Sequence, residues 1–290
     1  MSVLALGTAQ FGMDYGINNT RGRIREDEAA VILAYAADHG IRLLDTAAAY
    51  GGSEDVLGTL LERAPFSLSI VTKISAGTSD AVGSSFERSM RRLRARTLYG
   101  CLFHDLELFR RNPSAWRELA RFRERGMVKR IGFSLYTPEE WRFIEASGVE
   151  PDIIQLPLNV FDRRFAEEIP LMRRRGIEVH VRSVFLQGLA FRDPETLPDF
   201  FSPIRDAVRT LQRVAVEIGS TPAAVCLAFA LGVGADYTVV GVDSLEHLQQ
   251  LLAFEQAAPG LAAAIPMLQG CVVDDPDMIL PYRWPVQTAR

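Results

Sequence analysis

Short apolar runs alternate with longer segments of helical period about eight times along this chain of 290 residues. Several of the short runs are continuously apolar, which is typical of parallel strands covered by helices. We predict strands at residues 3–8, 42–45, 69–73, 99–104, 130–134, 152–155, 178–183 and 237–241.

Between the strands, the apolar positions recur with the period of amphipathic helices. Segment 26–39 places Ala29, Ile32 and Ala36 on one stripe and ends at Gly40, a residue that commonly terminates helices. The stretch Thr137-Pro-Glu-Glu140 combines a threonine cap, a proline at the first helical position and a capping-box acid. Further helices are predicted at 84–94, 114–125, 203–218, 222–231 and 245–254.

Eight strand-then-helix units without a Pro/Gly/Ser-rich linker predict one closed (β/α)8 TIM barrel, with residues 1–290 as a single domain. An insertion at about 187–202 follows the seventh strand, so it should lie on the carboxyl face, where the active sites of this fold are found. The alternative is an open doubly wound sheet. It is disfavoured because no Gly-x-Gly-x-x-Gly element follows any strand.

Composition narrows the class of partner. A formal net charge of −4 provides no basic field, so we do not expect nucleic acid as a partner. No apolar run approaches the roughly 20 residues that span a bilayer, and the start of the chain lacks the pattern of a signal peptide. Three widely spaced cysteines match no zinc pattern, so no metal is expected. We therefore expect a cytoplasmic protein.

Four polar side chains close or directly follow predicted strands or their loops. Asp45 ends the second strand, Tyr50 lies in the loop after it, Lys73 ends the third, and His104 ends the fourth. A tyrosine near a lysine and an aspartate suggests carbonyl reduction, which requires a proton for the oxygen that receives the hydride. Tyr50 would donate that proton.

The other three residues would assist Tyr50. A lysine cation lowers the pKa of a nearby phenol, which is ordinarily about 10. We therefore predict that Lys73 lowers the pKa of Tyr50, that Asp45 anchors Lys73 and that His104 directs the substrate carbonyl. Each residue also has a simpler interpretation when it is taken alone. Asp45 could cap a helix, Tyr50 could be an aromatic residue of a loop, Lys73 could be an exposed strand end, and His104 could be a structural histidine. For all four simpler interpretations to hold, four such side chains would have to lie at the ends of neighbouring strands by chance.

The same residues carry a resemblance to the aldo-keto reductase superfamily. Leu-Asp45-Thr-Ala-Ala-Ala-Tyr50-Gly-Gly-Ser-Glu54, Val-Thr-Lys73 and Leu-Phe-His104-Asp resemble its active-site segments, and further motifs follow in the family's order over nearly the whole chain. The resemblance implies a barrel that reduces aldehydes or ketones and binds a nicotinamide cofactor without a Rossmann motif. By position, the residues implied to contact that cofactor are Gly7, Thr8, Ala9, Ser134, Gln155, Arg182, Ser183, Phe185, Gly188, Gly241, Asp243, Ser244, His247 and Gln250.

Three departures from the family pattern matter. Arg182 stands where the family often has an aromatic residue that stacks on the nicotinamide, and Leu135 stands where it often has asparagine. At the adenosine end, Asp243 and His247 occupy a segment in which NADP-dependent members place lysine or arginine. An acidic residue suits a free ribose hydroxyl better than a 2′-phosphate, so we predict NAD(H) over NADP(H).

Two functions are compatible with these residues. The first is a reductase of a small carbonyl compound, with a sugar among the candidates. The second is an NAD(H)-binding regulator that senses cofactor state and binds a protein partner, because Tyr15-Gly-Ile and Pro281-Tyr-Arg-Trp284 resemble a bacterial branch of polysaccharide-associated reductases and KidO-like cell-division regulators. Insertion residues Phe191, Leu197, Phe200 and Phe201 could contact such a partner or simply pack against the barrel.

Overall fold

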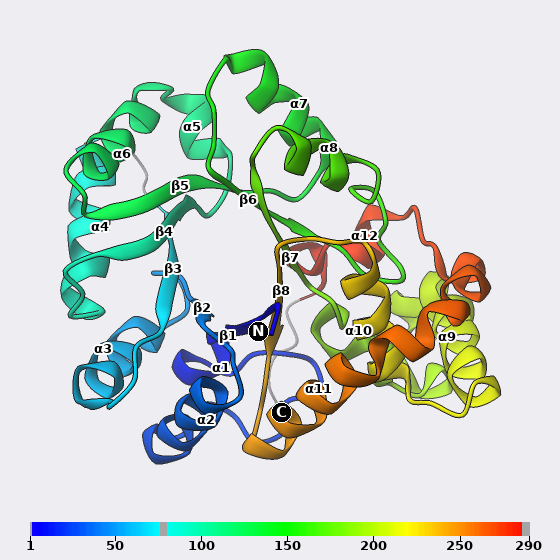
Figure 1. Cartoon of the computed structure of the whole chain (residues 1–290). Coiled ribbons are helices and arrows are strands. Elements are labelled where there is room, and N and C mark those ends of the chain that lie inside the picture. Colours follow the sequence, from blue (N-terminus) through cyan, green and yellow to red (C-terminus); the bar gives the residue numbers. More distant parts are fainter. Residues whose placement is uncertain (1, 76–79, 286–290) are drawn as a thin grey trace.

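The computed structural model describes residues 2–75 and 80–285 of the chain. Eight parallel strands form a closed barrel in sequence order, and β1 pairs with β8 to complete the ring. Helices surround the strands on the outside (Figure 1). The predicted (β/α)8 barrel is therefore confirmed, and the open doubly wound sheet is excluded.

Every predicted strand is present, with ends that differ from the expectation by no more than a few residues. The strands are β1 Leu4–Gly7, β2 Leu43–Asp45, β3 Ser69–Ile74, β4 Leu98–Phe103, β5 Val128–Ser134, β6 Ile153–Pro157, β7 Glu178–Arg182 and β8 Tyr237–Gly241.

The helices whose ranges were predicted are present, and the structure adds two longer outer helices, Ser53–Arg63 and Glu168–Arg174, for which no range was predicted. Those of the outer layer are α2 Glu26–Asp38, α3 Ser53–Arg63, α4 Asp80–Arg92, α6 Ser114–Glu124, α7 Pro138–Ser147, α8 Glu168–Arg174, α9 Arg205–Glu217, α10 Pro222–Gly232 and α11 Leu245–Ala257. Shorter pieces are α1 Ala9–Gly12, α5 Glu107–Arg111 and α12 Pro276–Ile279. The Thr137–Glu140 capping box is present, and Gly40 ends α2 with a φ of +86°.

The inside of the barrel is filled by apolar side chains from alternate strand positions. Six of them form a separate buried cluster, made of Ala5, Leu43, Val71, Leu102, Ile153 and Val239. A second and larger apolar cluster lies between the strands and the helices. The barrel is thus a packed core and not a channel, which leaves its carboxyl rim as the place for a site.

Strand register brings the predicted site residues together at this rim. Gly7 pairs with Asp45 on one side and with Gly241 on the other. Ser134 pairs with Gln155. Because all eight strands are parallel, their carboxyl ends share one edge of the barrel, and residues far apart in the sequence become neighbours.

The insertion after β7 is not an irregular loop. It contains the 3-10 helices η1 Leu186–Phe191, η2 Pro194–Thr196 and η3 Asp199–Ile204. Leu197 and Phe201 are buried, and the Phe201 ring lies 4.9 Å from that of Trp284. Phe200 is partly buried, whereas Phe191 is 41% exposed. The insertion therefore packs most of its own apolar residues against the barrel.

The expectation that no apolar run approaches the length of a bilayer span needs correction. The helical stretch Leu245–Cys271, formed by α11 and the 3-10 helix η4 Ala258–Cys271, is long and apolar enough to span a bilayer by length and composition. One such helix is weak evidence for a membrane span, because the core helix of a soluble protein meets the same criterion, and 28% of the apolar window is buried here. Leu248, Leu251 and Leu252 of this stretch are buried in the protein core, and Pro266 lies inside η4.

Close packing between β5 and β6 gives a stability prediction. A Cβ atom at Gly132 would lie 1.8 Å from the backbone oxygen of Ile153, so Gly132→Ala must push the two strands apart. We expect the free energy of unfolding in urea to fall by roughly 3 kcal/mol. Gly260→Ala is the matched control, since its Cβ meets nothing within 4 Å. If Gly132→Ala were as stable as this control, β5 and β6 could not be packed as closely as described at Gly132.

Candidate active site

Tight backbone packing fixes the loop that carries Tyr50. A Cβ atom at Gly12 would lie 1.9 Å from the backbone oxygen of Tyr50, so only glycine allows α1 to approach this loop. Gly51 has a φ of +56°, and the Gly52 amide donates to the Gly12 carbonyl at 3.3 Å. The Ser53 hydroxyl donates to the Thr8 carbonyl at 2.8 Å, which ties the start of α3 to the end of β1.

Behind Tyr50 lies a buried ion pair. The Lys73 ammonium nitrogen Nζ donates to Asp45 Oδ1 at 2.6 Å and to the Thr46 carbonyl at 3.0 Å. The second Asp45 oxygen accepts from Gln155 Nε2 at 2.7 Å. Both charged side chains are at most 5% exposed. Burial lowers the pKa of Lys73, and the Asp45 carboxylate opposes this shift and holds the Lys73 side chain in place.

The tyrosine and the histidine complete the cluster. Lys73 Nζ lies 5.1 Å from the centroid of the Tyr50 ring. The His104 ring meets the Tyr50 ring edge-on, with centroids 5.7 Å apart. The structure thus brings together the four residues that the sequence singled out, at the ends of β2, β3 and β4.

The direction of the Tyr50 pKa shift differs from the prediction. We expected Lys73 to lower the pKa of Tyr50, but burial raises it above its ordinary value, and the Asp45 carboxylate raises it further. Arg182, not Lys73, is the cation that opposes these effects. The physical reason is that Asp45 already neutralises Lys73, while the phenol has lost its contact with water. Tyr50 therefore keeps its proton at neutral pH.

His104 is uncharged in this environment. Burial lowers the pKa of His104 to about 3, and the Lys73 and Arg182 charges act in the same direction. A neutral imidazole can still donate or accept a hydrogen bond, so it can orient a carbonyl oxygen without adding a charge.

These residues border a cavity of about 680 Å³ on the carboxyl face. Asp45, Tyr50 and His104 line it, whereas Lys73 is buried behind them. Of the positions implied to contact a cofactor, those in the cavity wall are Gly7, Thr8, Ala9, Ser134, Arg182, Ser183, Phe185, Gly188, Gly241, Asp243, His247 and Gln250. Gln155 is fully buried below the wall, and Ser244 instead caps α11 by accepting from the His247 amide at 3.2 Å.

The backbone after β7 is strained where it borders the cavity. Ser183, Leu186 and Gln187 have φ values between +46° and +62°, a region that side chains other than glycine rarely adopt. Two hydrogen bonds from the segment before α2 hold this loop. The Ile17 amide donates to the Gln187 carbonyl at 3.0 Å, and Asn18 Nδ2 donates to the Gly188 carbonyl at 2.6 Å.

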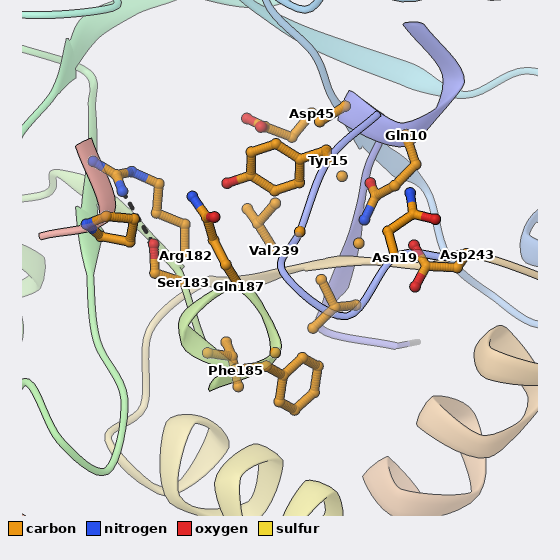
Figure 2. Close-up of a pocket in the computed structure, with 18 of the residues that line it drawn as sticks. Gln10, Tyr15, Asn19, Asp45, Arg182, Ser183, Phe185, Gln187, Val239 and Asp243 are labelled. Carbon is orange, nitrogen blue, oxygen red and sulfur yellow. Dashed lines mark hydrogen bonds between the residues drawn. The ribbon is translucent and has the colours of Figure 1, made fainter. Parts of the chain in front are cut away.

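Several lining residues were not identified as site residues from the sequence. Gln10, Asn19 and Val239 are in the cavity wall, and Tyr15 points across it between Asp45 and Gln187 (Figure 2). Tyr15 had been noted only for its resemblance to a branch of the family. Its signal was its place in the loop after the first strand, a position that belongs to the carboxyl face of any barrel.

Two of the buried polar atoms that lack a partner among the described residues belong to residues implied to contact the cofactor. They are Gln155 Oε1, below the nicotinamide end implied by the resemblance, and Asp243 Oδ1, at the adenosine end. Buried polar atoms are rarely left unpaired, and Asp243 lines the cavity, so its free oxygen marks a place where a sugar hydroxyl of a ligand fits. Gln155 is buried behind the wall. The wall thus fits the adenosine end of a nicotinamide dinucleotide.

Comparison with known proteins agrees with this geometry. Residues 3–259 match the model of the aldo/keto reductase family, and the chain belongs to that family. Membership makes the protein an oxidoreductase of the class that binds a nicotinamide cofactor. Among the described residues, no group of three or more His, Cys, Asp and Glu side chains is arranged to hold a metal ion.

Two relatives and two solved structures illustrate the similarity. An aldo-keto reductase of Mycobacterium sp. strain JLS is 32% identical over 67% of this chain and 72% of its own length. The 2,5-diketo-D-gluconic acid reductase B of Corynebacterium sp. strain SHS752001 is 30% identical over 73% of each chain. The structure of aldo-keto reductase AKR11C1 from Bacillus halodurans has a TM-score of 0.76 at 20% identity and 94% coverage of both chains. A mutant of Gox0644, solved in complex with NADPH, has a TM-score of 0.68 at 22% identity, covering 95% of this chain and 91% of its own.

The buried, neutral His104 predicts a pH dependence of stability. Because the pKa of His104 is about 3 in the folded protein and 6.5 for an unperturbed histidine, the unfolded chain takes up a proton first as the pH falls. Stability from this group is complete above pH 6.5 and is lost towards pH 3. Between pH 7 and pH 5, wild type should lose about 2 kcal/mol more unfolding free energy in urea than His104→Gln. If the unfolding free energy changed equally with pH in the two proteins, His104 would take up a proton as readily in the folded protein as in the unfolded chain.

Proposed function

We propose that the protein reduces the carbonyl group of a small molecule with a nicotinamide cofactor, and that Tyr50 donates the proton. The observation that carries this proposal is the pairing of a protonated, buried Tyr50 with the Lys73–Asp45 ion pair at the edge of the cavity. The relative named as a reductase of 2,5-diketo-D-gluconic acid supports a small polar carbonyl compound, with sugar derivatives among the candidates.

Each residue has a separate task in this reaction. The bound cofactor supplies hydride to the carbonyl carbon. Tyr50 retains its proton at neutral pH and gives it to the oxygen as negative charge develops there. Asp45 holds Lys73 5.1 Å from the centroid of the Tyr50 ring, and Arg182 is the cation that favours the tyrosinate left behind. His104, neutral and beside the Tyr50 ring, orients the carbonyl oxygen by a hydrogen bond.

Tyr50→Phe tests the proton donor. It removes one hydroxyl group, so we expect kcat/KM for NADH-dependent reduction of small aldehydes such as methylglyoxal to fall by about 100- to 10,000-fold. The dissociation constant of NADH, followed by its fluorescence, should change less than about threefold, since no binding contact is removed. Tyr35→Phe, on the outer helix α2, is the matched control.

Two results would count against this assignment. Retained turnover in Tyr50→Phe would remove Tyr50 from the donor role. If the wild-type protein bound NADH tightly but reduced none of the small aldehydes tested, the result would instead favour the regulatory alternative described below.

We also propose that NADH is preferred over NADPH. Asp243 lines the cavity with one carboxylate oxygen unpaired among the described residues, which suits a ribose hydroxyl and repels a phosphate dianion. Arg21 is the cation beside this segment, and it donates to the Asp243 backbone carbonyl at 2.8 Å. Its charge is already paired with Glu28 at 3.0 Å. The fold does not decide the preference, because a structural neighbour was solved with NADPH.

Titration with both cofactors tests this preference. We expect the dissociation constant of NADPH to exceed that of NADH by about tenfold or more. Asp243→Asn should lower the ratio of the NADPH dissociation constant to the NADH dissociation constant, because it removes the repulsion of the 2′-phosphate and keeps the shape of the side chain. Asp274→Asn, an exposed site outside the cavity wall, should leave the ratio unchanged. Equal affinities in wild type would refute the preference.

The regulatory alternative has narrower support. Arg182 and Leu135 depart from the family pattern at the nicotinamide end, and the branch markers Tyr15 and Tyr282 both line the cavity. Placement in the polysaccharide-associated or KidO-like branch rests on these markers. The insertion is a weak candidate for a partner surface, because Phe191 is its one strongly exposed aromatic residue among those described. We therefore place reduction first and keep the cytoplasm as the predicted compartment.

A further inference from the structure

Arg182 brings a positive charge without an acidic partner into the cavity. It ends β7 and lines the wall near Tyr50 and His104. Its guanidinium donates to the Leu135 carbonyl at 2.9 Å and to the Ser183 hydroxyl at 3.1 Å, and it lies 4.5 Å from the centroid of the Tyr136 ring. No described Asp or Glu side chain forms an ion pair with it. Uncharged groups alone therefore hold this cation in place.

The charges at this end of the cavity do not balance. The Asp45 carboxylate acts on the Tyr50 pKa, and the Lys73 ammonium and Gln155 amide already occupy both of its oxygens. His104 is neutral. Arg182 thus leaves one net positive charge beside the proton donor, and its field favours ionisation of both Tyr15 and Tyr50. A partly enclosed site with an unmatched cation favours an anionic ligand.

Tyr15 offers a second donor to the same space. Burial raises the pKa of Tyr15 to about 12, so its hydroxyl stays protonated. The Gln187 side chain acts to lower that pKa and so opposes the effect of burial. Tyr15 lines the cavity, and a protonated phenol there can donate to an acceptor of a ligand. Figure 2 shows this ring crossing the cavity on the side where Arg182 and Gln187 lie.

We infer that Arg182 and Tyr15 bind an anionic group of the substrate, so that the reaction selects small carbonyl compounds that carry a carboxylate, such as oxo acids and sugar acids. This inference rests on the proposed reductase function and names its substrate class. A carboxylate is favoured over a phosphate because one unpaired guanidinium neutralises a monoanion and not a dianion. Its planar N–H groups also match the two oxygens of a carboxylate.

Matched acids and esters test the inference by turnover. Pyruvate and succinic semialdehyde place the carboxylate at two distances from the carbonyl, and their methyl esters differ from them in lacking the charge. Wild type should reduce at least one of the acids with a higher kcat/KM than its ester. Arg182→Met should lower the ratio of kcat/KM for that acid to kcat/KM for its ester by about 10- to 100-fold, the effect of a lost charged hydrogen bond. Arg182→Lys should retain part of the preference.

Equilibrium binding provides a readout that does not need turnover. With NADH bound, calorimetry should give tighter binding of succinate than of succinamide, and Arg182→Met should remove the difference. Arg213→Met, on the exposed face of α9, is the matched control. Arg182→Met should weaken NADH binding much less than succinate binding, because the charge is assigned to the substrate.

The possible results separate the two proposals. If Arg182→Met weakens NADH as much as it weakens the acids, the charge serves the cofactor and the inference fails. If wild type does not distinguish acids from esters, or succinate from succinamide, the inference fails while the reductase function stands. If no carbonyl compound is reduced but succinate binds through Arg182, the reductase function fails and the anion site remains.

Discussion

The closure of eight parallel strands into one ring is the constraint on which the site depends. It places the ends of β1, β2 and β8 side by side, so that Gly7 lies between Asp45 and Gly241. No helix or loop has to bring these residues together, because the hydrogen-bond register of the sheet already does so. The loops then add what the rim lacks. The Tyr50 loop is fixed against Gly12, and the strained loop after β7 is fixed against Ile17 and Asn18.

The electrostatics of the cavity divide it into two ends. Near Tyr50, the Asp45 and Lys73 charges cancel, His104 is neutral and Arg182 remains positive. At the far end, Asp243 presents a carboxylate oxygen without a described partner. A long ligand that enters this cavity therefore meets a cationic end and an anionic end. The charges at the two ends of the cavity favour one orientation of a charged ligand before it makes close contacts with the wall.

Sequence patterns predicted the barrel, its strands and the gathering of the four polar residues, because each residue sits at or just beyond an apolar run. They failed where the outcome depends on groups from distant strands. The pKa of Tyr50 rises because burial and Asp45 outweigh the Arg182 charge, and that balance is visible only in three dimensions. Gln155 faces Asp45 below the cavity wall because of the register of β6. The bonds of Ile17 and Asn18 to the loop after β7 depend on positive φ angles at residues other than glycine, which no local pattern indicated.

The Lys73–Asp45 pair also bears on how this protein could change over evolution. Replacing either residue alone would leave an unpaired charge in the protein interior, at a cost of about 3 to 5 kcal/mol in folding. Selection for a stable barrel is then enough to keep both residues, whether or not a lineage still uses them for chemistry. Tyr50 and His104 carry no such charge, so they are free to drift once catalysis is lost. In descendants of this chain, the phenol and the imidazole would record continued catalysis more faithfully than the ion pair behind them.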